Sequence, residues 1–110
     1  MATVAQARRI FLEQPQAEEN SHMGHPDFRV ANKIFATLWP KRNVAVVMLS
    51  NADITAILQM HAEAVTLKHW GKKPYLEVDL PRADVALLRA LAEAAWRNRA
   101  PKKLVEARQP

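Results

Sequence analysis

The sequence predicts an α+β fold, a two-layer sandwich in which an antiparallel sheet carries helices on one face, in the order α-β-β-β-α-β-β-α. Apolar residues recur at helical spacing near both ends of the chain and once in the middle, whereas two other stretches alternate apolar and polar residues. Short turn-forming segments separate the alternating stretches, which favours hairpins over the crossovers of a parallel sheet. With 110 residues, the chain is expected to form a single domain over residues 1–110.

The first predicted element is a helix over residues 3–13. Thr3 can cap its first turn, apolar residues recur on one helical face, and Pro15 ends it. From residue 18 to residue 49 the apolar period changes to two, which is typical of half-buried strands. This stretch therefore predicts an antiparallel meander of three or four strands.

The turns of this meander are marked by residues that tolerate unusual backbone angles. Residues 24–26 (Gly-His-Pro) predict the first turn, and Asn32 lies in the second, because glycine and asparagine accept positive φ angles. The polar residues 40–43 predict a third turn. Residues 44–49 are all apolar and predict a buried strand.

The second half of the chain continues with a helix, a hairpin and a longer helix. The first of these helices is predicted to begin after Ser50, whose hydroxyl can accept a hydrogen bond from the first turn. Residues 65–70 and 75–80 read as strands joined in a hairpin around residues 71–74. Residues 83–99 carry a broad apolar stripe and predict the last helix.

The composition excludes several classes of function. The chain has no cysteine and two glycines, which excludes disulfides, thiol nucleophiles and glycine-rich phosphate loops. Its longest apolar run, within residues 44–49, is far too short to span a bilayer, and no signal peptide is recognised, so we expect a cytoplasmic protein. The last residues, from about 105 to 110, are expected to be frayed.

Basic side chains are concentrated in two segments of a chain whose formal net charge is +5. One is the predicted hairpin turn, where lysines surround a tryptophan, and the other is the end of the last helix. Two basic clusters on a small domain favour a polyanionic partner such as DNA, because neutralised phosphates release counterions. The predicted nucleic-acid-binding residues are Lys68, Trp70, Lys72, Lys73, Arg97, Arg99, Lys102 and Lys103.

Five segments resemble the signature of the MmcQ/YjbR-like family. They are residues 21–30 (SHMGHPDFRV), 33–36 (KIFA), 70–71 (WG), 78–80 (VDL) and 95–104 (AWRNRAPKKL), in the family's order. The resemblance extends over nearly the whole chain. It implies a frataxin-like (CyaY-like) sandwich and a DNA-binding role through a double-wing arrangement of hairpins. It implies no catalytic residue, and we expect no cofactor.

Metal binding and catalysis are weaker interpretations. His22 and His25, followed by Asp27, are residue types that ligate metals, but their spacing in a strand and turn does not bring both rings to one ion. We therefore expect a structural role and keep the two histidines only as weak metal candidates. The acids of the first helix are too few for the iron site of frataxin-like proteins. Ser21 and Ser50 are explained by a hairpin and a helix cap, so we expect no enzyme.

The main alternative to DNA binding is a module that binds a protein or a small ligand through the open sheet face or an adjacent groove. A homodimer is the third alternative, and it requires the apolar stripe of the last helix, or Trp39, to be exposed. The sequence favours a non-enzymatic DNA-binding protein that contacts phosphates and reads few bases.

Overall fold

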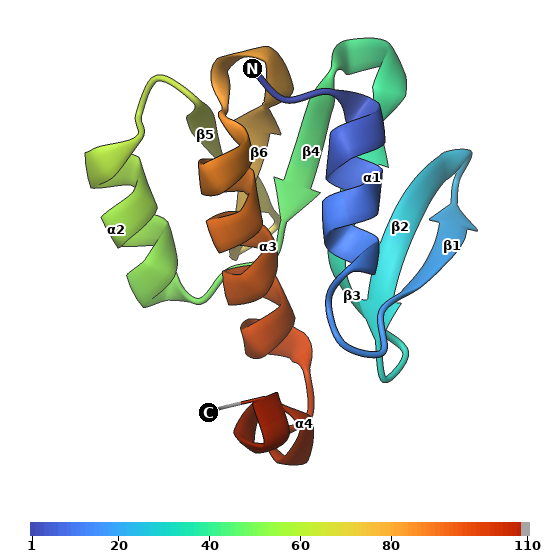
Figure 1. Cartoon of the computed structure of the whole chain (residues 1–110). Helices are drawn as coiled ribbons and strands as arrows, with labels where there is room; N and C mark the ends of the chain where they lie inside the picture. Colours follow the sequence, from blue (N-terminus) through green and yellow to red (C-terminus); the bar gives the residue numbers. More distant parts are fainter. Residues whose placement is uncertain (109–110) are drawn as a thin grey trace.

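The computed structural model describes residues 1–108, without the side chain of His22. The elements, drawn in Figure 1, are α1 (Val4–Leu12), β1 (Glu18–His22), β2 (His25–Val30), β3 (Lys33–Trp39), η1 (Pro40–Arg42), β4 (Val44–Val47), α2 (Asn51–Met60), β5 (Val65–Trp70), β6 (Lys73–Asp79), η2 (Leu80–Arg82), α3 (Val85–Arg99) and α4 (Lys102–Arg108). Within these residues, none of the helices has the length and apolar character that crossing a membrane requires.

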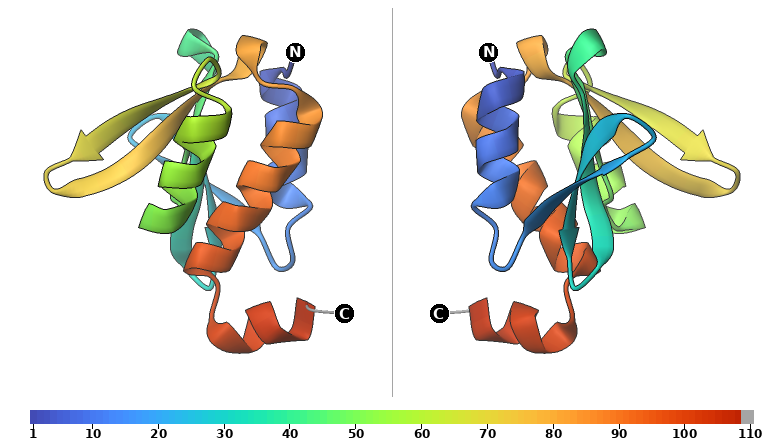
Figure 2. Two further views of the ribbon diagram at one scale, coloured as in Figure 1. Left: turned by 90° about the vertical axis from the view of Figure 1, so that its left-hand side faces the viewer. Right: turned by 90° about the vertical axis from the view of Figure 1, so that its right-hand side faces the viewer.

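Six strands form one antiparallel sheet in the order β1-β2-β3-β4-β6-β5. Helices α1 and α3 cover one face of the sheet, and α2 packs against β5 and β6 (Figure 1). The other face is left without a helix among the described residues (Figure 2). The predicted α+β class and antiparallel sheet are confirmed. The meander before α2 has four strands, which is the larger of the two numbers expected from the alternation and one more than the predicted element order contains.

The core lies between the sheet and the helices α1 and α3. Phe11 of α1 packs against Phe28 of β2 and Phe35 of β3, with ring centroids 5.1 and 6.2 Å apart. Trp96 of α3 is fully buried, and its Nε1 donates a hydrogen bond of 2.8 Å to the backbone oxygen of Pro15. The apolar stripe of α3 therefore faces the core and offers no exposed surface for a dimer.

The predicted helix starts at Thr3 and Ser50 are confirmed, and at each of them a side chain caps the first turn. Thr3 Oγ1 accepts from the backbone N–H of Gln6, while Gln6 Oε1 accepts from the backbone N–H of Thr3, which makes a reciprocal capping box. Ser50 Oγ likewise accepts from the backbone N–H of Asp53 at the start of α2. Helix α3 begins two residues later than predicted, because Asp84 is its N-cap and is not itself helical.

The turn between β1 and β2 differs from the prediction. It consists of Met23 and Gly24, whose φ angles of 52° and 85° are those of a two-residue type I′ turn. His25 and Pro26, which the sequence places in the turn, belong to β2, because a two-residue turn leaves His25 paired with His22. The predicted turn was therefore wrong in position, and glycine is its second residue rather than its first.

The C-terminal segment forms a short helix, α4, that the sequence does not predict. Fraying was predicted from about 105 to 110, but α4 remains helical as far as Arg108, and residues 109–110 lie outside the described residues. The guanidinium of Arg108 lies 4.7 Å from the centroid of the Trp96 ring and donates a hydrogen bond of 2.8 Å to Gln14 Oε1. These partners are distant in sequence, so local pattern alone does not reveal them.

Candidate nucleic-acid interface

The hairpin formed by β5 and β6 projects beyond the body of the protein. In Figure 2 its turn lies away from α1 and α3, on the side of the sheet that no described helix covers. Val65 at the root of β5 is buried, whereas every later residue of the strand is exposed. The turn is Gly71–Lys72, with a φ angle of 61° at Gly71. We call residues 68–73 the basic hairpin.

Strand register gives the basic hairpin a defined face. Lys68 pairs with Tyr75, and Trp70 pairs with Lys73. Directly opposed residues of an antiparallel pair share one face of the sheet, and successive residues alternate between faces. These four side chains therefore project from one face, opposite to the side on which Val65 is buried.

The charges of the basic hairpin are not neutralised within the fold. Lys68, Lys72 and Lys73 are exposed, and none forms an ion pair with a described residue. Most arginines of the described chain do pair with an acid. Trp70 is 78% exposed and stacks on no described ring. The hairpin therefore presents three unpaired cations and a bare indole to solvent.

The C-terminal basic residues have a different environment. Arg97 Nε lies 3.1 Å from Glu93 Oε2, and Lys102 Nζ lies 4.0 Å from Glu106 Oε1. Arg99 is half-buried, and its Nε has no hydrogen-bond partner among the described residues. Lys103 is exposed and has no ion pair in the described chain. Part of this cluster's charge is therefore balanced locally, unlike that of the basic hairpin.

The structure does not bring the two predicted clusters together. Helix α4 follows the far end of α3, whereas the basic hairpin extends from the side of the molecule, and both views of Figure 2 separate them. Within each cluster the residues are close together in the sequence. The residues Lys68, Trp70, Lys72 and Lys73 form one group, and Arg97, Arg99, Lys102 and Lys103 form another.

The weak metal candidates sit at the tip of the β1–β2 hairpin. His22 and His25 are directly opposed in the register, but the side chain of His22 lies outside the described residues. His25 stacks on Trp39, with ring centroids 3.7 Å apart. In the part of the chain that the structure describes, no three His, Asp or Glu side chains are grouped to hold a metal ion.

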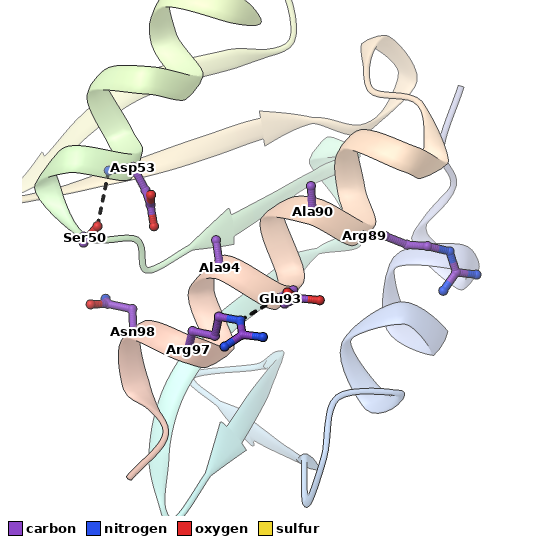
Figure 3. A pocket seen from close by; sticks show the side chains of 8 residues that line it. All are labelled: Ser50, Asp53, Arg89, Ala90, Glu93, Ala94, Arg97 and Asn98. Carbon is purple, nitrogen blue, oxygen red and sulfur yellow. Dashed lines mark hydrogen bonds and ion pairs between the residues drawn. The ribbon is translucent and has the colours of Figure 1, made fainter. Parts of the chain in front are cut away.

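A polar groove lies between the start of α2 and α3 and has a volume of about 640 Å³ (Figure 3). Ser50 and Asp53 line one side, and Arg89, Glu93 and Arg97 line the other. Most of these groups are already engaged: Ser50 caps α2, Arg89 pairs with an acid of the segment after α1, and Arg97 pairs with Glu93. The groove carries both signs of charge and no preference for an anion.

Sequence reasoning missed a second hollow, on the other side of the sheet. It has a volume of about 450 Å³ and is lined by the tip of the β1–β2 hairpin, the end of β3 and η1. His25 and Trp39 both line it, and Lys41 and Arg42 add positive charge. Strand alternation alone does not reveal this hollow, because His25 comes opposite Trp39 only after the β2–β3 pairing shifts by one residue between Phe28 and Arg29.

Comparisons with known proteins agree with this fold. The chain is similar to the crystal structure of Deinococcus radiodurans protein DR2400, described as a DUF419 domain, with a TM-score of 0.74 and 18% sequence identity. The similarity covers 89% of this chain and 78% of that chain, and at this identity it shows a shared fold alone. No curated protein matches the sequence. The YjbR family profile matches residues 12–98, which is most of the chain, so the predicted resemblance is confirmed and the chain belongs to the YjbR family.

Proposed function

We propose that this protein is a non-enzymatic DNA-binding protein that contacts phosphates through the basic hairpin. The observation that carries the proposal is the cationic tip itself, where three lysines without an acid partner among the described residues surround an indole that is 78% exposed. Lysine ammonium groups bind phosphates as point charges, and an exposed indole can stack on a base or a sugar. Contacts to phosphates carry no base information, so low sequence specificity is expected.

The projection of the hairpin supports the same function. A strand pair that extends beyond the helices can approach a duplex without bringing the body of the protein against it (Figure 2). The C-terminal cations lie elsewhere and are partly paired with Glu93 and Glu106. We therefore assign them a secondary, non-specific contribution to DNA binding rather than a share of one continuous surface.

Charge reversal separates the two clusters experimentally. We expect Lys72→Glu combined with Lys73→Glu to weaken binding of a mixed-sequence duplex by roughly 10- to 100-fold, because two phosphate contacts become repulsions. The matched variant, Lys102→Glu with Lys103→Glu, has the same change in charge and is expected to lose less than about threefold. Electrophoretic shift or fluorescence anisotropy measures both affinities, and thermal unfolding shows that both variants remain folded.

Two results would remove the basic hairpin from the proposal. One is equal loss of affinity in the two double variants, since net charge and not position would then decide binding. The other is duplex affinity in the hairpin variant that matches the unchanged protein. An unchanged protein that binds no duplex at low salt would end the DNA-binding proposal itself.

Salt dependence gives an independent measure of the number of phosphate contacts. Three lysines on B-DNA imply a slope near −2.7 for log K against log salt concentration, because each contact contributes about −0.9. The Lys72→Glu and Lys73→Glu double variant should retain a slope of about −0.9 or shallower. A slope in the unchanged protein steeper than about −5 would mean that cations beyond the hairpin make most of the contacts.

A further inference from the structure

The hollow beside the β1–β2 hairpin is not used by the proposed function. Its volume of about 450 Å³ falls within the range of small-ligand pockets, roughly 300–1,000 Å³. Four kinds of surface meet in it: the stacked pair of His25 and Trp39, two prolines, the exposed tip at Met23, and the cation of Lys41.

The aromatic part of the hollow is held in place before any ligand enters. The rings of His25 and Trp39 lie with centroids 3.7 Å apart and planes inclined by 34°. Trp39 Nε1 also donates a hydrogen bond of 3.0 Å to Thr37 Oγ1, which fixes the orientation of the indole. Both rings are only half-buried. When a planar ligand packs against this pair, few protein side chains have to be ordered, so the entropy cost of binding is small.

The walls of the hollow are backbone that cannot easily rearrange. Pro26 lies in β2 and Pro40 begins η1, and proline holds φ near −65°. Met23, in the β1–β2 turn, also lines the hollow and is 84% exposed. An unbranched thioether side chain adapts to the shape of a ligand, so Met23 can close over a planar ring without strain in the walls.

The charge beside these rings is positive. Lys41 is exposed and forms no ion pair with a described residue, whereas Arg42 lies 2.9 Å from Glu77 Oε1. An anionic ligand can therefore bind Lys41 without breaking an existing ion pair. An ammonium group next to a stacked aromatic pair suits a ligand that combines a planar ring with a phosphate.

We propose that this hollow binds a nucleotide, with the base against the Trp39–His25 pair and the phosphate at Lys41. The site shares no residue with the basic hairpin, so it does not depend on DNA binding there. A free mononucleotide and a nucleotide within a single strand offer the same chemistry, and the experiment distinguishes these two sources.

Nuclear magnetic resonance tests the proposal through the indole N–H signals of Trp39, Trp70 and Trp96. Titration with adenosine monophosphate is expected to move the Trp39 signal saturably and to leave that of the buried Trp96 unchanged. Lys41→Ala should weaken this binding by at least about fivefold, through loss of a charge-assisted contact. Lys33→Ala is the matched control, because Lys33 is an exposed lysine at the other end of β3.

Inorganic phosphate and adenosine, titrated separately, should each bind more weakly than the monophosphate. A short single-stranded oligonucleotide, added to the Lys72→Glu and Lys73→Glu variant, reveals whether a strand reaches the hollow without the hairpin. A response of Trp39 to the oligonucleotide alone supports the site with a strand as its source. The proposal is overturned if neither nucleotide nor oligonucleotide moves Trp39, if phosphate alone binds as well, or if Lys41→Ala behaves like Lys33→Ala. None of these results changes the duplex affinity of the basic hairpin.

Discussion

Replacing Trp96 with alanine is expected to lower the free energy of unfolding by about 3–5 kcal/mol, the usual cost of truncating a buried aromatic side chain. The indole is fully buried, its Nε1 donates a hydrogen bond to Pro15, and its ring lies under the guanidinium of Arg108. One side chain thus joins α3, the loop after α1 and α4. Calorimetry or circular dichroism should show the melting temperature fall by more than about 10 °C.

Trp96→Phe separates the two contributions of the indole. Phenylalanine keeps most of the apolar volume but cannot donate to Pro15, so the expected loss is about 1–2 kcal/mol. In both variants α4 loses part of its anchor, and its amides should exchange faster with solvent. A loss below about 1.5 kcal/mol for Trp96→Ala, or equal losses in the two variants, would contradict this role.

The elements that the sequence predicts best are those whose signal is local. Helices α1 and α2 begin where Thr3 and Ser50 can accept hydrogen bonds from their first turns, and the caps lie within three residues of their partners. Strand β6 alternates because only one of its faces meets the helices. Strand β3 has two buried residues in succession, Phe35 and Ala36, where its pairing with β2 is irregular. What fails is the β1–β2 turn, because Met23 takes a φ of 52° that glycine or asparagine usually provides.

Helix α4 was not predicted from the sequence, for a different reason. Nothing in residues 102–108 alone compensates for the entropy of ordering a short helix. The compensation comes from contacts with the rest of the fold: Arg108 contacts Gln14 and Trp96, and two apolar residues of α4, Leu104 and Val105, pack against the hydrophobic core. A pattern read within a local window contains no information about such contacts.

The residues of the candidate site also differ in whether a local sequence segment predicts them. The basic hairpin could be predicted because Lys68, Trp70 and Lys73 lie within one turn-containing segment, and strand alternation already places Lys68 and Trp70 on the same face. The distance between this segment and α4 depends on how the sheet twists and where α3 ends, which composition does not specify. The Trp39–His25 pair also joins two strands, so its recognition requires the register and not only the residue types.

The open face of the sheet contains one further group, Asp27, whose pairing with Arg29 was not predicted from the sequence. Asp27 is fully buried although it lies opposite Thr37, on the face that no described helix covers. Arg29 covers it: Nε lies 2.9 Å from Oδ1, and Nη2 lies 3.1 Å from Oδ2. These hydrogen bonds raise the pKa of Arg29 above its ordinary value. Because that pKa is raised, the stabilisation is fully present below the pKa of arginine in the unfolded chain, and it does not vary near neutral pH.

Asp27→Asn is expected to destabilise the protein by about 2 kcal/mol. Removing one partner of a buried pair costs about 3–5 kcal/mol, but the Arg29 side chain is 24% exposed and can turn toward water, which reduces the loss. Chemical denaturation in urea measures the change. Added salt should leave it nearly constant, because ions screen a buried pair poorly.

Two further variants decide whether the ion pair causes this loss. Glu77→Gln breaks the Arg42 pair, whose arginine side chain is 53% exposed, so we expect a loss below about 1 kcal/mol. Replacing both buried partners, Asp27→Asn with Arg29→Met, should be less destabilising than Asp27→Asn alone, because no guanidinium is then left without its carboxylate. If the double variant is the less stable of the two, the bidentate contact is not what Asp27 contributes, and the packing of its side chain against β3 must explain its burial.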